Sequence, residues 1–264
     1  MKKNFNIGII GLGYVGKAVL HGFASNNIYT FDISEDCTEN NLEDLSDKAD
    51  IIFVCVPTPM REDGSCSIDI VKQVLNDLDS YSRKHEVIIK STIPPGTSSY
   101  FENKYTNLNI IFNPEFLTEA NFYDDFMKQD RIILAGKNLS IAEELYQKNF
   151  SQTEIIKLKY GEAEMVKYFS NSFLALKVSF ANEIYSLCYK LNIDYDQVIE
   201  AATKDKRIGT SHLSVPGPDG KKGFGGSCFP KDINALLAVF ENNDVESIVL
   251  KAVWERNQII DRNE

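Results

Sequence analysis

Phe5-Asn6-Ile7-Gly8-Ile9-Ile10 is a short apolar run that leads directly into Gly11-Leu12-Gly13-Tyr14-Val15-Gly16. The apolar run predicts a strand, and the amphipathic residues through Ala24 predict a helix. Three glycines at this spacing allow a tight turn, close approach of a pyrophosphate to the backbone, and close packing of the helix on the strand. The pattern therefore predicts that residues 11–16 bind a dinucleotide at the amino-terminal end of a helix.

A second predicted strand, at residues 28–31, ends in Asp32, twenty-one residues after Gly11. A carboxylate at this position accepts hydrogen bonds from ribose hydroxyls. It also repels the 2′-phosphate of NADP, and no arginine follows it in Ile33-Ser34-Glu35-Asp36. The expected cofactor is NAD.

Apolar strands and helices continue to alternate as far as residue 159. The predicted strands cover residues 51–56, 87–90, 109–112, 131–134 and about 154–158, and the predicted helices cover about 68–81 and 140–150. The acidic segment from Asp36 to Asp50 has room for only a short helix. Strands that alternate with helices are typical of a Rossmann-type, doubly wound parallel sheet. We expect an α/β fold with an NAD-binding domain at residues 1–159.

Three polar segments directly follow predicted strands, at the edge where such sheets bind ligands. They are Val56-Pro57-Thr58-Pro59, Ser91-Thr92-Ile93-Pro94 and Asn113-Pro114-Glu115-Phe116-Leu117-Thr118-Glu119. The two glutamates of the last segment are candidates for a general acid and a general base. The same two residues are also compatible with capping or surface roles.

The pattern changes after residue 160. From Glu162 to Leu191 there is no proline and no glycine, and apolar residues recur at helical spacing, which predicts one long helix. Lys167 and Asn171 are four residues apart and share a face of it, although either side chain alone is compatible with a surface position. Shorter helices are predicted at about 196–203, 231–242 and 245–261. We expect an all-helical central domain at residues 160–264, which forms a homodimer through the long helix.

Cys228 lies in Gly223-Phe224-Gly225-Gly226-Ser227-Cys228-Phe229-Pro230-Lys231-Asp232, a glycine-rich turn before a predicted helix. The helix amino terminus and the nearby ammonium group favour the thiolate, which makes Cys228 a candidate nucleophile. The chain has five cysteines and no C-x-x-C pair, which argues against disulfides and a zinc site, and no metal is expected. Cys55 and Cys188 are predicted in the core, and Cys37 and Cys66 in polar loops.

The net charge of −10 over 264 residues argues against nucleic acid and anionic membranes as partners. No apolar run approaches the ~20 residues of a membrane span, and the Met1-Lys2-Lys3-Asn4 start leads into a strand rather than a signal peptide, so a cytoplasmic protein is expected. Residues 204–231 contain six lysines and arginines against two aspartates, a local balance of 6 − 2 = +4. This basic segment suits a phosphorylated small molecule, or a solvated loop face.

Taken together, these motifs resemble the UDP-glucose/GDP-mannose dehydrogenase family, the nucleotide-sugar dehydrogenases. The glycine loop, the three polar segments, Lys167-x-x-x-Asn171, Arg207-Ile208-Gly209 and residues 223–232 match in order along the whole chain. The resemblance implies oxidation of the 6-hydroxyl of a nucleotide sugar to a carboxylate, with two NAD reduced. Ser227 and Phe229, on either side of the cysteine, resemble the residues at these positions in the members that act on UDP-glucose. GDP-mannose and UDP-N-acetylhexosamine remain alternative substrates.

The resemblance also implies roles for individual residues. Cys228 is expected to capture the aldehyde as a thiohemiacetal that becomes a thioester. Lys167 is expected to stabilise the oxyanion, with Asn171 and Asp232 as hydrogen-bonding companions. Glu115, Glu119 and Thr92 are expected to activate water. The expected contacts to NAD, besides residues 11–16 and Asp32, are Val56, Pro57, Thr58, Pro59, Ser91, Thr92 and Glu119. The expected contacts to the sugar nucleotide are Glu115, Phe116, Leu117, Lys167, Asn171, Arg207, Phe224 and Gly225.

Two further alternatives differ in class. β-Hydroxyacid dehydrogenases share the Rossmann domain, the long helix and K-x-x-x-N, but they stop after one hydride transfer and need no thiol, so Cys228 argues against them. A cofactor-binding fragment with little activity is the other alternative. The family's third, nucleotide-gripping domain has no counterpart in the sequence, and weak binding of the sugar nucleotide by residues 1–264 alone is expected for that reason.

Overall fold

The computed structural model describes residues 4–81 and 83–263, so the Met1-Lys2-Lys3 start lies outside the described residues. The chain divides into two compact units. The first comprises Met1–Pro59 and Ser67–Lys167, and the second comprises Met60–Cys66 and Tyr168–Glu264. A short segment of the amino-terminal half of the sequence therefore belongs to the second unit.

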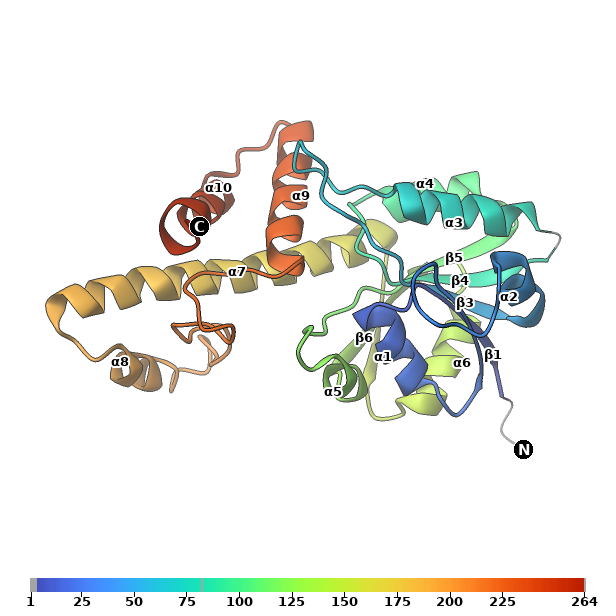
Figure 1. Ribbon diagram of the computed structural model, residues 1–264, viewed down its shortest axis with the longest axis horizontal. Coiled ribbons are helices and arrows are strands. Elements are labelled where there is room, and N and C mark those ends of the chain that lie inside the picture. Colours follow the sequence, from blue (N-terminus) through green and yellow to red (C-terminus); the bar gives the residue numbers. More distant parts are fainter. Residues whose placement is uncertain (1–3, 82, 264) are drawn as a thin grey trace. The chain divides into compact units, whose positions relative to one another are not determined.

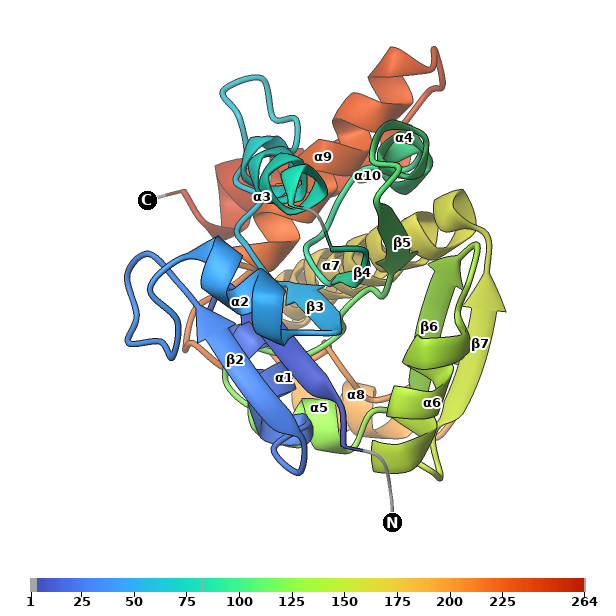
Figure 2. The same ribbon diagram turned by 90° about the vertical axis from the view of Figure 1, so that its right-hand side faces the viewer.

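The described part of the first unit contains a seven-stranded sheet (Figure 2). Its strands are β1 (Asn6–Ile10), β2 (Asn27–Phe31), β3 (Ile51–Val54), β4 (His85–Ile89), β5 (Leu108–Phe112), β6 (Arg131–Gly136) and β7 (Glu154–Leu158). Their order across the sheet is β2-β1-β3-β4-β5-β6-β7, and β1 pairs in parallel with both β2 and β3. The sheet thus winds outward in both directions from β1, which confirms the predicted fold class.

The direction of the last two strands differs from the prediction of a wholly parallel sheet. β6 runs antiparallel to β5, with Ile111 opposite Gly136 and Phe112 opposite Ala135, and β7 runs parallel to β6. Only a loop and the six-residue helix α5 (Phe122–Met127) connect β5 to β6. This connection contains no helix long enough to carry the chain back to the edge where β5 begins. β6 therefore starts near the edge where β5 ends and runs antiparallel to it.

Helices cover both faces of the sheet (Figure 1). On one face, α2 (Leu42–Lys48), α3 (Asp69–Ser80), α4 (Thr97–Lys104) and the first turns of α7 (Tyr160–Leu191) pack on buried aliphatic residues such as Ile52, Val87 and Ile110. On the other face, α1 (Tyr14–Gly22), α5 and α6 (Ser140–Asn149) pack around Phe23, Phe53 and Tyr146. Burial on both faces explains the continuous apolar runs in the strand sequences.

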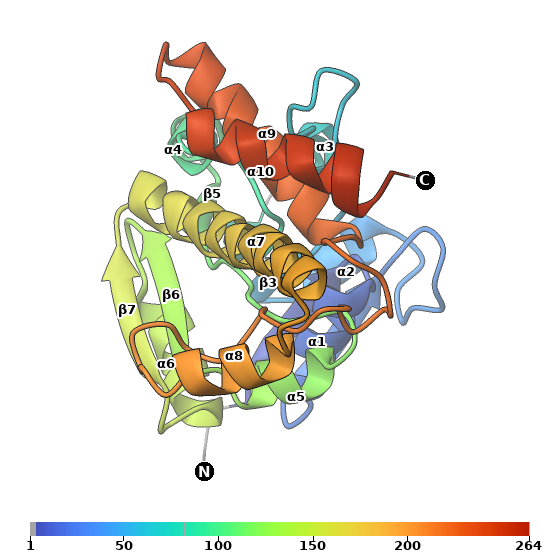
Figure 3. The same cartoon turned by 90° about the vertical axis from the view of Figure 1, so that its left-hand side faces the viewer.

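In the second unit, α7 is the element on which the others pack (Figure 3). Ala175, Leu176 and Val178 of α7 contact α9 (Cys228–Asn242) and α10 (Ile248–Arg256). Farther along, Ala181 and Cys188 pack with α8 (Tyr195–Ala202) and the loop after it. A π-helical turn, η1 (Asn257–Asp261), continues α10. As predicted, regular structure in this unit is helical, with α7 as the one long helix, apart from a single β-bridge in Met60–Cys66.

The cysteines follow the predictions with one exception. Cys55 and Cys188 are buried and Cys37 is exposed, and no disulfide joins the five cysteines, all of which lie in the described part of the chain. Cys66, predicted in a polar loop, is instead buried in a small bridge with Met60. None of the helices within residues 4–81 and 83–263 has both the length and the apolarity that a membrane span requires.

Candidate active site

The glycine loop joins β1 to α1, and its three glycines differ in what surrounds them. Gly11 has φ +91°, and a Cβ there would lie 2.7 Å from the carbonyl oxygen of Cys55. A Cβ on Gly16 would lie 1.8 Å from the carbonyl oxygen of Gly11, so the helix could not approach the turn. At Gly13 a Cβ would meet no described atom within 4 Å. The first and third glycines are thus required by the protein itself, and the second faces open space.

Asp32 follows β2 and fastens the glycine loop. Its carboxylate accepts hydrogen bonds from the backbone N–H of Leu12 at 2.6 Å and of Ser34 at 2.7 Å. Partial burial alone would raise the pKa of Asp32, but these hydrogen bonds outweigh it, and the pKa lies below its ordinary value. The carboxylate is therefore ionised at neutral pH and stands beside the loop, where a ribose would lie.

The loop fits NAD on the evidence of this geometry. The open space at Gly13 adjoins the amino terminus of α1, where backbone N–H groups attract phosphate. Lys17, in the first turns of α1, pairs with Glu35 at 3.1 Å, so a cation that could otherwise attract a 2′-phosphate already has an anionic partner. The residues present thus suit a dinucleotide without that phosphate.

The segments after β3 and β4 are joined at the carboxyl edge of the sheet. The hydroxyl of Ser91 donates a hydrogen bond to the carbonyl oxygen of Val56 at 2.7 Å. Thr58 is buried, Thr92 is half-buried, and Pro57 and Pro59 are exposed. The predicted NAD contacts from these two segments therefore belong to one connected edge of the first unit.

A buried polar cluster lies beneath that edge. The ammonium group of Lys90 lies 2.7 Å from a carboxylate oxygen of Glu115 and donates to the side-chain oxygen of Asn113 at 2.8 Å. The hydroxyl of Tyr146 donates to the same Asn113 oxygen. Burial chiefly raises the pKa of Tyr146 well above its ordinary value, and the negative charge of Glu115 adds to this. Tyr146 therefore serves as a neutral donor.

The surroundings of this cluster make Cys55 unsuitable as a nucleophile. Burial raises the pKa of Cys55 to about 12, an effect that Lys90 partly opposes and Glu115 reinforces. A thiol with such a pKa is protonated at neutral pH and reacts poorly. Cys55 is thus a packing residue behind the glycine loop.

Lys167 reaches the same region from α7. Its ammonium group donates to the carbonyl oxygen of Glu115 at 2.6 Å and lies 5.6 Å from the centre of the Phe116 ring. The structure therefore brings Lys167 to Glu115 and Phe116, which were predicted from a different motif. Leu117 is half-buried against the core cluster that contains Phe23 and Tyr146, and Glu119 is half-buried in the turn before α5.

Glu164, one turn before Lys167, ties α7 to the segment that contains Thr92. Its buried carboxylate accepts hydrogen bonds from the backbone N–H of Gly96 at 2.6 Å and of Ser98 at 2.7 Å. These N–H groups belong to the amino terminus of α4, where a carboxylate is favoured. Burial is the largest influence and raises the pKa of Glu164 despite these hydrogen bonds.

In the second unit, Cys228 is the first residue of α9 and is exposed. Asp232, one turn later, is buried and accepts hydrogen bonds at 2.6 Å from the side chains of Asn171 and Lys231. The structure thus joins two of the predicted site residues, Asn171 of α7 and Asp232 of α9, by a hydrogen bond, while their roles beside Lys167 stay predictions. The start of the cysteine helix is anchored to α7 through them.

Three of the predicted contacts to the sugar nucleotide, Arg207, Phe224 and Gly225, lie in the segment between α8 and α9. Phe224 is buried, and Gly225 follows it. The side chain of Arg207 is 90% exposed, and its guanidinium group pairs with the nearby Asp205. Arg207 is therefore directed to a local partner and not toward Asn171 or Asp232.

The predictions from sequence missed four residues of this site: Lys90, Asn113, Tyr146 and Glu164. A signal existed for Lys90, because a lysine at the end of the apolar run Val87-Ile88-Ile89 needs an anionic partner once that strand is buried. Glu164 similarly lies among residues of α7 that face the core. Asn113 and Tyr146 carry no charge and offered no comparable signal.

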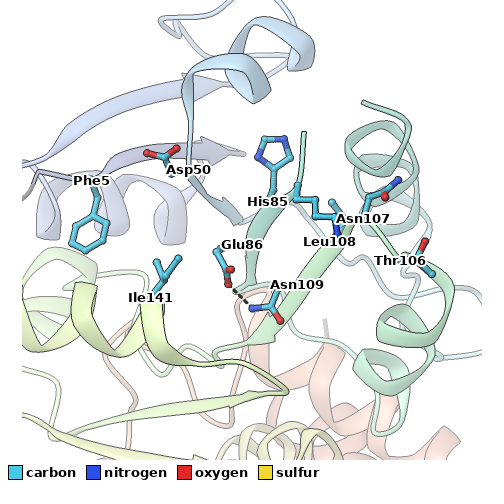
Figure 4. A pocket seen from close by; sticks show the side chains of 10 residues that line it. Phe5, Asp50, His85, Glu86, Thr106, Asn107, Leu108, Asn109 and Ile141 are labelled. Carbon is cyan, nitrogen blue, oxygen red and sulfur yellow. Dashed lines mark hydrogen bonds between the residues drawn. The ribbon is translucent and has the colours of Figure 1, made fainter. Parts of the chain in front are cut away.

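A pocket of about 530 Å³ lies elsewhere in the first unit (Figure 4). Its lining includes Phe5, Asp50, His85 and Leu108, which lie at the amino-terminal ends of β1, β3, β4 and β5. Sheets of this class bind ligands at the opposite edge. None of the predicted site residues lines the pocket, and the dashed contact in Figure 4 is a hydrogen bond from Asn109 to Glu86.

The sheet, the glycine loop and Asp32 together define a dinucleotide-binding protein of the Rossmann class. Residues 37–150 match the model of the UDP-glucose/GDP-mannose dehydrogenase family, NAD binding domain, and residues 161–259 match the model of that family's central domain. The chain belongs to the UDP-glucose/GDP-mannose dehydrogenase family. The predicted family and the prediction of an NAD-binding domain are confirmed, and the exact boundary between residues 159 and 160 stays a prediction.

Individual relatives agree with this placement. UDP-glucose 6-dehydrogenase of Rickettsia bellii is 37% identical over 217 residues, which cover 78% of this chain and 49% of the relative. The corresponding enzyme of Rickettsia typhi is 30% identical, over 96% of this chain and 67% of the relative. The structure of a UDP-glucose dehydrogenase from Pyrobaculum islandicum superposes with a TM-score of 0.84 at 30% identity. The superposition covers 97% of this chain and 68% of the other. The chain thus spans between half and two thirds of the length of these relatives.

Proposed function

We propose that this chain takes part in the NAD-dependent oxidation of the 6-hydroxyl of a nucleotide sugar to a carboxylate, with UDP-glucose as the substrate. The relatives named UDP-glucose 6-dehydrogenase support the substrate. GDP-mannose and UDP-N-acetylhexosamines are the alternatives within the family. The observation that carries the proposal is the exposed thiol of Cys228 one helical turn before the buried Asn171–Asp232 pair.

The first unit supplies cofactor binding and charge. Residues 11–16 and Asp32 hold NAD, which accepts a hydride in each of the two oxidations. The ammonium group of Lys167, whose position the carbonyl oxygen of Glu115 fixes, stabilises the developing alkoxide and later the oxyanion. Glu115, Glu119 and Thr92 hold and activate the water that hydrolyses the thioester.

The second unit supplies covalent capture. The sulfur of Cys228 forms a bond to C6 of the aldehyde, and the aldehyde oxygen takes up a proton, which gives a thiohemiacetal. Loss of a hydride from C6 and of that proton gives a thioester. Water then adds to C6, the C–S bond breaks, and the acid leaves while the thiol is regenerated. Capture in this form keeps the aldehyde in place between the two oxidations.

Substitution of Cys228 tests this mechanism in the active protein that carries this chain. Cys228→Ala is expected to abolish formation of the acid while NAD binding is unchanged, and Cys228→Ser is expected to accumulate an ester visible by mass spectrometry. Cys37→Ala, which removes another exposed cysteine, is the matched control and is expected to retain activity. Two NAD reduced per sugar by the alanine variant would show that the covalent mechanism is wrong.

A single oxidation, as in β-hydroxyacid dehydrogenases, is the second candidate function. It requires Lys167 and Asn171 but no thiol, so the two candidates differ in the number of NAD reduced per substrate. One NADH per substrate, with Cys228→Ala fully active, would favour this candidate. The position of Cys228 at the start of α9 favours two oxidations.

We also propose a homodimer formed through α7. Phe169 and Phe173 stack on its surface with ring centres 6.0 Å apart, and they are 66% and 50% exposed. They line an apolar groove of about 400 Å³ together with Ile248 and Val249 of α10, which are also exposed. A second copy of the same face would cover these side chains. Analytical sedimentation tests this proposal. The parent chain is expected to sediment as a dimer and Phe173→Asp as a monomer.

A further inference from the structure

The turn that follows α10 holds the glycine-rich loop in the second unit. Asn257, the first residue of η1, is 4% exposed. Its side-chain amide donates to the carbonyl oxygen of Phe224 at 3.0 Å, and its oxygen accepts from the backbone N–H of Phe224 at 2.8 Å. Both backbone groups of a buried residue, which would otherwise lack secondary-structure partners, are therefore satisfied by one side chain.

The glycines on either side of Phe224 fit this contact sterically. Gly223 has φ +65°, and a Cβ there would lie 2.4 Å from the side-chain oxygen of Asn257 and 2.7 Å from Cβ of Asp261. A Cβ on Gly225 would lie 3.0 Å from the guanidinium group of Arg262. The loop thus has glycine at both positions where η1 and the residue after it come closest.

Arg262 adds a second point of attachment. Its backbone N–H donates to the carbonyl oxygen of Asn257 at 2.8 Å, and its guanidinium group binds the carboxylate of Asp219 at the other end of the loop. The loop is therefore held at Asp219 and at Phe224, four residues before Cys228. A π-helical turn of this kind is rare and occurs often at functional sites.

We infer that Asn257 is a positioning residue that, together with Arg262, fixes the loop from Asp219 to Ser227 and so presents Cys228 in one conformation at the start of α9. The inference rests on the proposed role of Cys228 as the nucleophile. A mobile loop would present the thiol in productive geometry for only part of the time, which lowers the rate of covalent capture.

Alkylation of Cys228 by iodoacetamide tests the inference without any dehydrogenase activity. The rate at Cys228, followed by peptide mass spectrometry, is divided by the rate at the same cysteine in the urea-unfolded chain. In the parent chain this ratio is expected to differ from one by threefold or more at pH 7, because the loop holds the thiol in a defined setting. In Asn257→Ala the ratio is expected to approach one, and amide exchange of Phe224 to accelerate on the order of tenfold or more.

Asn243→Ala is the matched control, because Asn243 is an exposed asparagine of the same unit that bonds to a helix carbonyl at 2.8 Å. It is expected to keep the parent ratio. Gly223→Ala tests the same contact from the loop side and is expected to act like Asn257→Ala, so a folding failure of one variant leaves the other. Melting curves identify a variant that does not fold.

A parent ratio of one, or an unchanged ratio in Asn257→Ala and Gly223→Ala, would overturn the inference. Failure of the proposed function is recognised separately, by retained acid formation in Cys228→Ala. Asn257→Ala could change the alkylation of Cys228 while Cys228→Ala still forms the acid. In that case the positioning role of Asn257 would hold, and only the proposed catalytic role of Cys228 would be wrong.

Discussion

The ammonium nitrogen of Lys90 lies 2.7 Å from a carboxylate oxygen of Glu115, and the side chain of Lys90 is 1% exposed. A buried pair of this kind costs little when both partners are present, but removal of one partner leaves a buried charge. Lys90 is therefore part of the framework that orients Glu115, although no sequence motif singled it out.

Lys90→Met is expected to lower the free energy of unfolding by about 3–5 kcal/mol, because Glu115 then lacks its cation. The double variant Lys90→Met/Glu115→Gln is expected to lose clearly less than the sum of the two single changes. Urea titrations measure these differences. Lys128→Met, which removes an exposed lysine paired with the exposed Asp124, is the control and is expected to cost less than about 1 kcal/mol. Additive losses in the double variant would contradict a coupled pair.

The second prediction concerns cofactor choice and Asp32. NAD is expected to bind at least about tenfold more tightly than NADP, a difference of about 1.4 kcal/mol. Asp32→Asn is expected to reduce this preference, because the carboxylate that repels a 2′-phosphate is removed. Calorimetric titration with both cofactors measures it, and Asp36→Asn is a control at an exposed aspartate nearby. Equal affinities of the parent chain for NAD and NADP would refute the prediction.

The third prediction concerns pH and His85. Burial is the main cause that lowers the pKa of His85 below its ordinary value of 6.5, and the Arg83 charge adds to this. The unfolded chain therefore binds the proton more readily, so stability is present above pH 6.5 and is lost as the pH falls below it. His85→Gln is expected to reduce the stability lost between pH 7.5 and 5, because the group that takes up the proton on unfolding is removed.

Denaturant titrations at the two pH values check the His85 prediction. Thr106→Ala changes a non-titrating neighbour in the same pocket and is expected to keep the parent pH dependence. The pKa of His212 is also lowered by burial, but His212 is present in every variant and cancels in the comparison. A His85→Gln variant with the parent pH dependence would assign the proton uptake to other groups.

The fourth prediction concerns the sugar nucleotide. Residues 1–264 alone are expected to bind UDP-glucose with a dissociation constant of about 1 mM or weaker, because Arg207 and Arg262 are already paired with Asp205 and Asp219. Asp205→Asn, which releases Arg207, is expected to tighten binding by about threefold. Calorimetry measures both constants, and NAD binding by the same sample serves as the control for folding. Micromolar affinity for UDP-glucose in the parent chain would contradict this prediction.

Most of the fold could be predicted from sequence, because its strands are buried on both faces and read as apolar runs. Two helices of the first unit were not predicted. α4 contains few apolar residues, and the carboxylate at its amino terminus belongs to Glu164, far along the chain. α5 has only six residues. Contacts between distant residues therefore determine the elements that local patterns did not indicate.

The candidate site could be anticipated from sequence where a motif singles out the residue, as in the glycine loop at residues 11–16 and in Asn171 and Asp232, whose roles stay predictions. It was not predictable where long-range packing selects the partner. The ion pair of Lys90 with Glu115 spans two strands, and the amide of Asn257 replaces a strand that the loop at Phe224 lacks. A single sequence carries no local pattern for either contact.

The assignment of Met60–Cys66 to the second unit has a practical consequence for dissecting this protein. The polypeptide passes from one unit to the other three times, after Pro59, after Cys66 and after Lys167. A nick after Lys167 would therefore leave a fragment that still contains seven residues of the other unit, including Gly64 next to Asn234 of α9. Reassembly of separately expressed halves, residues 1–167 and 168–264, should therefore depend on this short segment.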